Sequence, residues 1–255
     1  MGTLADKLEC IASNEERIYE HGYNKGYGAG YDDAYSSGYN ECYDAFWDNY
    51  QDNGNRTYYK YGFMGYGWTD ETFKPKYELN MVGDISNMFR ESRIVDLRKG
   101  CPNGLDLTNV TVPTYPFHSS TIKYAPKIII GENSQLNGFL SYSENLETIE
   151  ELYFPPVNNT NTTHNCRYCY ALRRCNITGV ITMTSSFAES SLLETEDAIN
   201  TILHLKDYGS DTANMYKKTI TFHADVWAKL DALGNASPNG NTWKEYVSDL
   251  GWKVG

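Results

Sequence analysis

The sequence predicts an α/β protein in which a long N-terminal helix precedes a solenoid of short strands, and a mixed α/β segment covers the end of the solenoid. Three observations predict this fold. Tyrosine recurs at every fourth residue near the N-terminus, a serine motif recurs in the middle of the chain, and helix and strand patterns alternate in the last fifth. We expect four segments: a helical oligomerisation stalk (1–51), an aromatic, glycine-rich connector (52–80), the solenoid (81–205) and a C-terminal cap (206–255).

The stalk is predicted to be one helix. Leu4, Leu8 and Ile11 follow a capping Thr3 at helical spacing, and tyrosine then returns every four residues. Four residues turn a helix by about 400°, so the tyrosine stripe winds slowly around it. The residues of this pattern are Gly22, Tyr23, Gly26, Tyr27, Gly30, Tyr31, Tyr35, Gly38, Tyr39 and Tyr43.

The glycines of the stalk predict self-association. Each glycine costs a helix roughly 1 kcal/mol relative to alanine, and a lone helix would have nothing to offset that cost. Close approach of partner helices offsets it, with tyrosine rings lying in the grooves above the glycines. We therefore expect a homo-oligomer, specifically a trimer. The alternative is a flexible glycine and tyrosine tract of low complexity.

The middle of the chain contains a degenerate repeat of the form F-x-x-S-x-[IL]. "FRESRI" begins at Phe89, "FHSSTI" at Phe117 and "FAESSL" at Phe187, and two weaker copies begin at Leu140 and Leu172. A short apolar run follows each copy, which is the pattern of a leucine-rich-repeat solenoid. The small residue at the fourth position is expected to lie buried at a bend and to bond backbone groups there. This predicted ladder comprises Ser92, Ser120, Ser143, Cys175 and Ser190.

Several motifs together resemble one family. They are "YDAFWDNYQDNGNRT" and "GWTDETFKPKY" within residues 43–77, the degenerate repeats, and a C-terminal "GWKV". In these features the chain is similar to BspA-like leucine-rich-repeat proteins of gut bacteria and their phages, some of which carry a glycine- and tyrosine-rich stalk. The resemblance implies a virion protein without catalysis, fibre-like in the tail or baseplate, that contacts the host surface. Its partners would be other virion proteins, through the stalk, and a host surface polymer or protein.

Two other roles stay open: a head fibre or capsid decoration protein, and a bacterial cell-surface adhesin. The N-terminus shows no signal-peptide pattern, which counts against the adhesin and favours synthesis in the host cytoplasm followed by assembly into the virion. The net charge of −11 argues against nucleic acid as a partner, and no apolar run is long enough to predict membrane insertion.

The sequence offers few residues for chemistry. His164, Cys166, Cys169 and Cys175 lie within twelve residues, but a second metal-binding knuckle is missing, so we expect no metal, no cofactor and no catalytic residues. Plain thiols are the favoured state of these cysteines, with a disulfide and a metal site as alternatives. The aromatic residues of the connector, Trp68 among them, either pack the junction between stalk and solenoid or bind a ligand.

The C-terminal residues predict the cap in detail. We expect a helix over 195–208 capped by Thr195, a strand within "KKTITFH", and two short helices in "ADVWAKLDAL" and "TWKEYVSDLG". Thr242 would begin the second of these helices and Gly251 would end it. "WKV" would form a last short strand.

Overall fold

The computed structural model describes residues 63, 65, 67–74, 79–112, 115–131, 139–156 and 163–255. The predicted stalk, and with it every residue of the glycine and tyrosine pattern, lies outside this part of the chain. All described residues belong to the unit that covers residues 58–255.

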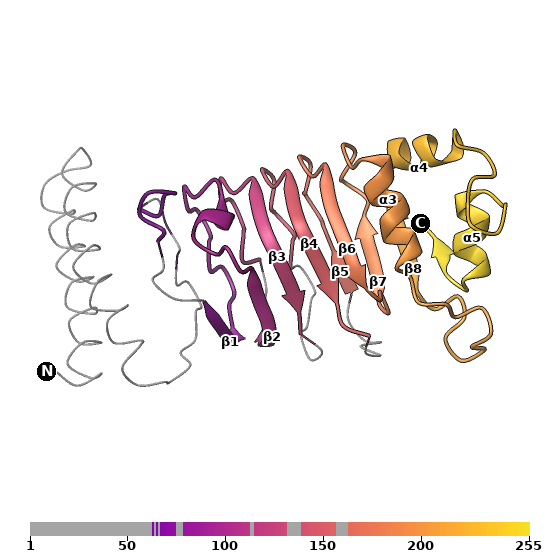
Figure 1. Cartoon of the computed structure of the whole chain (residues 1–255), viewed down its shortest axis with the longest axis horizontal. Helices are drawn as coiled ribbons and strands as arrows, with labels where there is room; N and C mark the ends of the chain where they lie inside the picture. Colours follow the sequence, from indigo (N-terminus) through magenta and orange to yellow (C-terminus); the bar gives the residue numbers. More distant parts are fainter. Residues whose placement is uncertain are drawn as a thin grey trace, which may run out of the picture. The chain divides into compact units, whose positions relative to one another are not determined.

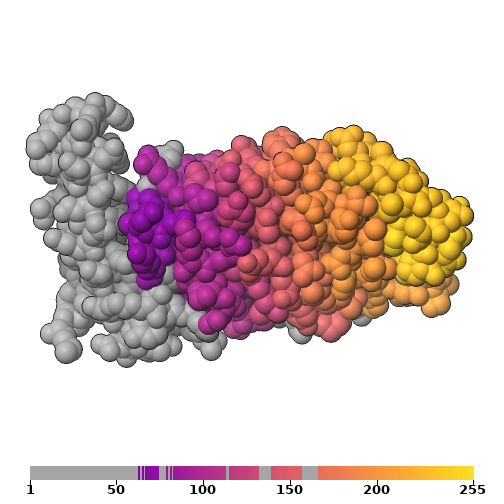
Figure 2. All heavy atoms as spheres, turned by 45° about the horizontal axis from the view of Figure 1, so that its top comes forward, coloured from indigo at the N-terminus to yellow at the C-terminus, as the bar shows by residue number. Residues whose placement is uncertain are grey.

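Two parallel sheets organise the described residues (Figure 1). The first contains, in spatial order, β1 (Asn80–Asp84), β2 (Leu105–Val112), β3 (Tyr124–Ile130), β4 (Thr148–Phe154) and β6 (Arg174–Gly179). The second contains β5 (Thr163–Asn165), β7 (Thr184–Phe187), β8 (Thr219–Phe222) and β9 (Lys253–Val254). Every neighbouring pair is parallel, so the chain advances one coil at a time. This arrangement confirms a parallel-strand, solenoid-like fold with few helices, and Figure 2 shows the successive coils as bands of colour.

The interior of the solenoid is built from rows of apolar residues that match from coil to coil. Leu105 is paired with Ile128, Ile128 with Leu152 and Leu152 with Ile177, and none of the four is more than 2% exposed. Burying each such side chain contributes roughly 1.5–3 kcal/mol. A coil cannot hide its own row, because the neighbouring coils supply the apolar surface above and below it.

The turns that precede β2, β3, β4 and the helix α3 (Thr195–Leu203) carry the repeated small residue. Ser92, Ser120, Ser143 and Ser190 are buried, and the backbone N–H of each donates to the carbonyl three residues earlier. The Ser120 hydroxyl donates to the Phe117 carbonyl at 2.8 Å, whereas the hydroxyls of Ser92 and Ser143 are buried with no hydrogen-bond partner. Small size is therefore the property that all copies share.

The fourth copy of the repeat is placed differently from the prediction. The Cys169 N–H donates to the carbonyl three residues earlier, that of Cys166, as the N–H of each ladder serine does. Leu172 follows Cys169 by three residues, just as Leu146 follows Ser143 and Leu193 follows Ser190. Cys175 instead lies in β6, paired with Ile149. The weak copy thus begins at Cys166 rather than at Leu172, and the copy spacings become 28, 23, 26 and 21 residues. A cysteine stands in both the first and the fourth place of this copy, which hides it from a search for Phe and Ser.

The described part of the connector forms a coil of its own. The Phe63 N–H donates to the Met88 carbonyl at 2.8 Å, and the Phe63 ring stacks on Phe89 with centroids 5.4 Å apart. Trp68 and Phe73 each meet Phe63 edge-on at 5.0 Å, and all four aromatic residues are buried. For Trp68 the structure favours packing over ligand binding.

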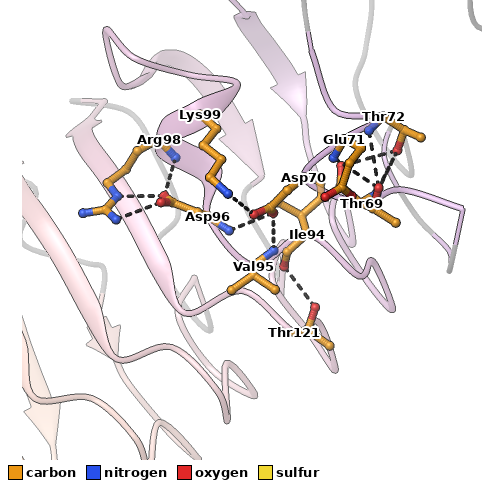
Figure 3. Close-up of polar contacts among 10 residues, drawn as sticks. All are labelled: Thr69, Asp70, Glu71, Thr72, Ile94, Val95, Asp96, Arg98, Lys99 and Thr121. Carbon is orange, nitrogen blue, oxygen red and sulfur yellow. Dashed lines mark hydrogen bonds and ion pairs between the residues drawn. The ribbon is translucent and has the colours of Figure 1, made fainter.

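A polar network joins this first coil to the next (Figure 3). One oxygen of Asp70 accepts the N–H groups of Val95 (2.7 Å) and Asp96 (3.0 Å), and the other accepts Lys99 Nζ at 2.7 Å. Desolvation raises the pKa of Asp70, but these hydrogen bonds outweigh it and hold the pKa below its usual value. Asp96 begins the short 3-10 helix η1 (Leu97–Lys99) and binds the Arg98 guanidinium through both carboxylate oxygens.

The edge of the first sheet is covered by α3 (Thr195–Leu203). Asp197 accepts the backbone N–H of Cys175 at 3.1 Å, and Asn200 donates to the Ile177 carbonyl at 2.8 Å. Arg174 lies 2.6 Å from the second oxygen of Asp197. Side chains of a helix thus replace the strand that β6 lacks, which removes an exposed edge.

The remaining elements of the C-terminal segment are α4 (Ala224–Asp231), α5 (Trp243–Asp249), β8 and β9. The predicted cap of α5 is confirmed, since Thr242 and Glu245 form a capping box and Gly251 follows the helix at φ +79. The predicted cap of α3 is wrong: Glu194 precedes the helix with an extended backbone and Thr195 is its first residue. The helix also ends at Leu203, because the chain then pairs with Ile181 at Leu205.

The corrected register predicts opposite outcomes for two cysteines. Cys169→Ser should change the free energy of unfolding by less than about 1 kcal/mol, because serine fills this place in the other copies and the Leu140 carbonyl lies 2.9 Å from Sγ. Cys175→Ser should cost about 2 kcal/mol, because it buries a hydroxyl within the apolar interior. Urea unfolding of both variants measures the difference, and a larger loss for Cys169→Ser would contradict the register.

Candidate functional site

Two surfaces of the solenoid present side chains at regular intervals, and the first is the outer face of the five-stranded sheet. Its charges satisfy one another: Lys127 Nζ lies 2.9 Å from a carboxylate oxygen of Glu151, and the Thr178 hydroxyl donates to Glu151 at 2.7 Å. The bond from Thr178 and then that from Lys127 lower the pKa of Glu151 against desolvation. A ligand would have to displace these contacts, so this face is best explained as a solvated surface.

The second surface is a row of aromatic side chains on the turns. We call it the aromatic strip, and it consists of Tyr115, His118, Tyr142, Tyr168 and Tyr170. The first four side chains are half-buried, whereas Tyr170 is 51% exposed. The turns that carry these residues follow one another along one side of the solenoid (Figure 1).

The rings of the strip contact one another from coil to coil. Tyr142 meets Tyr115 at 5.2 Å and His118 at 5.0 Å between ring centroids, both close to edge-on. It meets Tyr168 on the following coil at 4.7 Å with a tilt of 35°, and Tyr168 meets Tyr170 at 5.9 Å. The strip is therefore continuous over three successive coils.

Backbone pairing fixes the spacing of the strip. Tyr142 and Tyr168 each stand directly before the small residue of their turn, Ser143 or Cys169, and the Tyr142 N–H donates to the Arg167 carbonyl at 2.8 Å. Parallel strands lie about 4.8 Å apart, which accounts for the separation of the two rings. The position of the rings thus follows from the same ladder that holds the coils together.

Three tyrosines of the strip have left-handed backbone conformations: φ is +51° at Tyr115, +64° at Tyr142 and +62° at Tyr168. Ser119 and Glu91 have positive φ at the place that Tyr142 and Tyr168 occupy in the two following coils. Asn87 has positive φ at the place equivalent to Tyr115, so these turns adopt the conformation with several residue types. It costs a residue with a side chain roughly 1–2 kcal/mol, and glycine would avoid that cost. The positive φ is therefore a property of the turn, whereas the row of contacting aromatic rings is not required by it.

The charges beside the strip nearly balance. Arg90 pairs with Glu91 at 3.1 Å, and the Arg167 guanidinium lies over the Tyr168 ring at 4.8 Å from its centroid. Glu189 accepts the Tyr168 N–H at 2.6 Å. Desolvation and then the charge of Arg90 lower the pKa of His118, so its imidazole is neutral at neutral pH.

The sequence did not identify the strip, although it held a signal. Tyrosine stands directly before the small residue in two consecutive copies, Tyr142–Ser143 and Tyr168–Cys169. Placing the fourth copy at Cys175 put Tyr168 out of register with Tyr142. The residues proposed for the ladder are all interior and do not meet a ligand: the four serines lie in turns, and Cys175 lies in β6.

The cysteines of the described part of the chain are buried thiols outside any disulfide: Cys101, Cys166, Cys169 and Cys175. Burial raises the pKa of Cys101, Cys166 and Cys175, which disfavours the thiolate needed for nucleophilic attack or metal binding. Within the described ranges, no three acidic, cysteine or histidine side chains gather as a metal site would require. The side chain of His164 lies outside the described residues.

Comparison with known proteins adds no identification: no family model, no curated protein and no solved structure matches the chain. In the part of the chain that the structure describes, no helix has the length and apolar character needed to cross a membrane.

The strain in the strip predicts an unusual order of stability. At Tyr142 and Tyr168, replacement by glycine should leave the protein about 1 kcal/mol more stable than replacement by alanine, because only glycine adopts positive φ without cost. At Tyr170, whose φ is not positive, alanine should be the more stable replacement. Thermal unfolding of the six variants gives the order of their stabilities. If the alanine variant is the more stable one at all three positions, the backbone at Tyr142 and Tyr168 is not strained.

Proposed function

We propose that the protein is a non-enzymatic binding module that contacts a surface polymer through the aromatic strip. The observation that carries the proposal is the continuous contact of Tyr142, Tyr168 and Tyr170 on the outside of successive coils, with two of the three in a strained backbone conformation. Tyrosine buries a large area on binding and loses little conformational entropy, which suits it to recognition.

Rigidity of the support favours the same conclusion. The Tyr142 backbone is bonded to the next coil and the Tyr168 N–H is bonded to Glu189, so the rings are ordered before a ligand arrives. Ordering in advance reduces the entropy lost on binding. Carboxylates of the sheet face such as Glu151 are held by hydrogen bonds and ion pairs, and burial raises the pKa of Cys101, Cys166 and Cys175, so these groups are not activated as nucleophile or base.

The wider setting of the proposal comes from the sequence. We propose an irregular leucine-rich-repeat solenoid that the stalk, residues 1–51, gathers into a homo-oligomer in a phage tail or baseplate, where the strip contacts the host. Linked copies would raise the avidity of weak single sites by on the order of 10²-fold without new contacts. A head fibre or decoration protein and a bacterial surface adhesin are the alternatives, and the genes next to this one distinguish them.

Binding to cells tests the proposal. Labelled full-length protein is mixed with a panel of intact gut bacteria, and bound protein is measured after sedimentation. We expect saturable binding to at least one strain, and an affinity at least tenfold weaker for the variant Tyr168→Gly/Tyr170→Ala. Tyr153→Ala on the sheet face is the matched control and should bind as the wild type does.

Three outcomes would count against this function. If the protein binds no strain, it does not contact a cell surface. If the strip variant binds as tightly as the wild type, the strip is not the binding surface. Sugars or peptides released into the supernatant by the wild type would show an enzyme.

A further inference from the structure

We infer that the aromatic strip binds a neutral polysaccharide chain that lies along the solenoid and crosses from one coil to the next. The inference rests on the proposed function, and it adds the chemical class and the direction of the ligand.

The regularity of the strip favours a polymer of flat repeating units. Tyr142 and Tyr168 stand at the same place of two consecutive turns, and their ring centroids are 4.7 Å apart, a spacing set by the parallel backbone. Tyr115, from another place in the preceding turn, extends the row at 5.2 Å from Tyr142. A surface that repeats in one direction offers similar contacts to each unit of a linear polymer. The irregular surface of a folded protein does not match such a repeat.

The chemistry of the strip suits sugar rings. A pyranose has a face of C–H groups, which packs on an aromatic ring, and an edge of hydroxyl groups, which needs hydrogen-bond partners. The strip supplies rings with polar edges, and the half-exposed neutral imidazole of His118 and the exposed carboxylate of Glu144 lie beside them. Tyr170, the most exposed ring, presents the largest surface for such packing.

The charge distribution argues against an anionic polymer. Of the two arginines beside the strip, Arg90 is paired with Glu91 and Arg167 is held over Tyr168. Glu144 and Glu189 add negative charge to the same surface, and the whole chain carries −11. The surface of the strip therefore offers no excess of positive charge for nucleic acids or for polymers rich in phosphate or carboxylate.

The narrowness of the strip argues against a protein partner. A stable protein interface buries roughly 800 Å² on each side around a core depleted of charge. The strip is a single row of rings, and Arg90, Glu91, Glu144, Arg167 and Glu189 lie beside it.

The test uses full-length protein and cells of a strain that the wild type binds. Periodate, which cleaves sugars with adjacent hydroxyl groups, should reduce binding at least tenfold, whereas protease treatment of the cells should leave it unchanged. Cells stripped of phosphate polymers should bind as before, and the neutral polysaccharide extracted from them should compete. Affinity should change less than threefold between 50 and 500 mM NaCl, because no ion pairs form with the ligand.

Variants assign the effect to the strip. Tyr170→Ala should weaken binding of the extracted polysaccharide about tenfold, and Tyr170→Phe should retain most of the affinity because it keeps the ring. Tyr216→Ala is the control, since Tyr216 is 44% exposed and lies outside the strip.

The outcomes separate the inference from the function on which it rests. Binding could depend on the strip and yet be lost after protease treatment or fall steeply with salt. That result would show that the ligand is not a neutral polysaccharide, while the proposal of a binding module would stand. Polysaccharide binding that Tyr170→Ala does not weaken would overturn the placement on the strip. Absence of binding to any cell would contradict both the proposed function and the polysaccharide inference.

Discussion

The parallel backbone ladder between coils is the constraint on which the rest of the structure depends. A coil can pair with its neighbours only if every turn returns the chain to the same position, and a small buried residue in the turn allows that return. Ser92, Ser120, Ser143, Cys169 and Ser190 fill this place, and two of the serines lack any hydrogen-bond partner for the hydroxyl. The stack also needs covered ends. Phe63 and Asp70 belong to the coil that covers Phe89, and Asp197 and Asn200 replace the missing strand beside β6.

The candidate site is a consequence of that ladder. In four of the five turns φ is positive directly before the small residue, and in two consecutive coils this place holds tyrosine where glycine would cost less. Pairing between the coils then brings the rings of Tyr142 and Tyr168 within 4.7 Å of each other. The same pairing leaves the sheet face covered with matched charges such as Lys127 and Glu151, whereas the well-exposed ring of Tyr170 lies on a turn.

The sequence predicted the solenoid-like stack and the elements of its C-terminal segment, because the apolar runs and the capping residues are local signals. Thr242 and Gly251 are at the predicted ends of α5. The sequence did not predict the register of the fourth copy, where Cys169 occupies the turn position that serine occupies in the other copies. The contact between Tyr142 and Tyr168 was therefore not predicted either. Contacts between coils depend on insertions of unequal length, which the pattern of one copy does not reveal. The bond from the Cys175 N–H in β6 to Asp197 likewise joins residues 22 positions apart in the sequence, and no local pattern predicts it.

Amide hydrogen exchange of the full-length protein tests the central claim, that the backbone ladder fixes the aromatic strip. The amides of Tyr142 and Tyr168 donate to the Arg167 carbonyl and the Glu189 carboxylate, although both residues lie on surface turns. The account predicts that both amides are protected at least as strongly as the turn amide of Thr121, which donates to the Ser92 carbonyl of the adjacent coil. Exchange of Tyr142 and Tyr168 at the rate of an unstructured chain, with Thr121 protected, would contradict it.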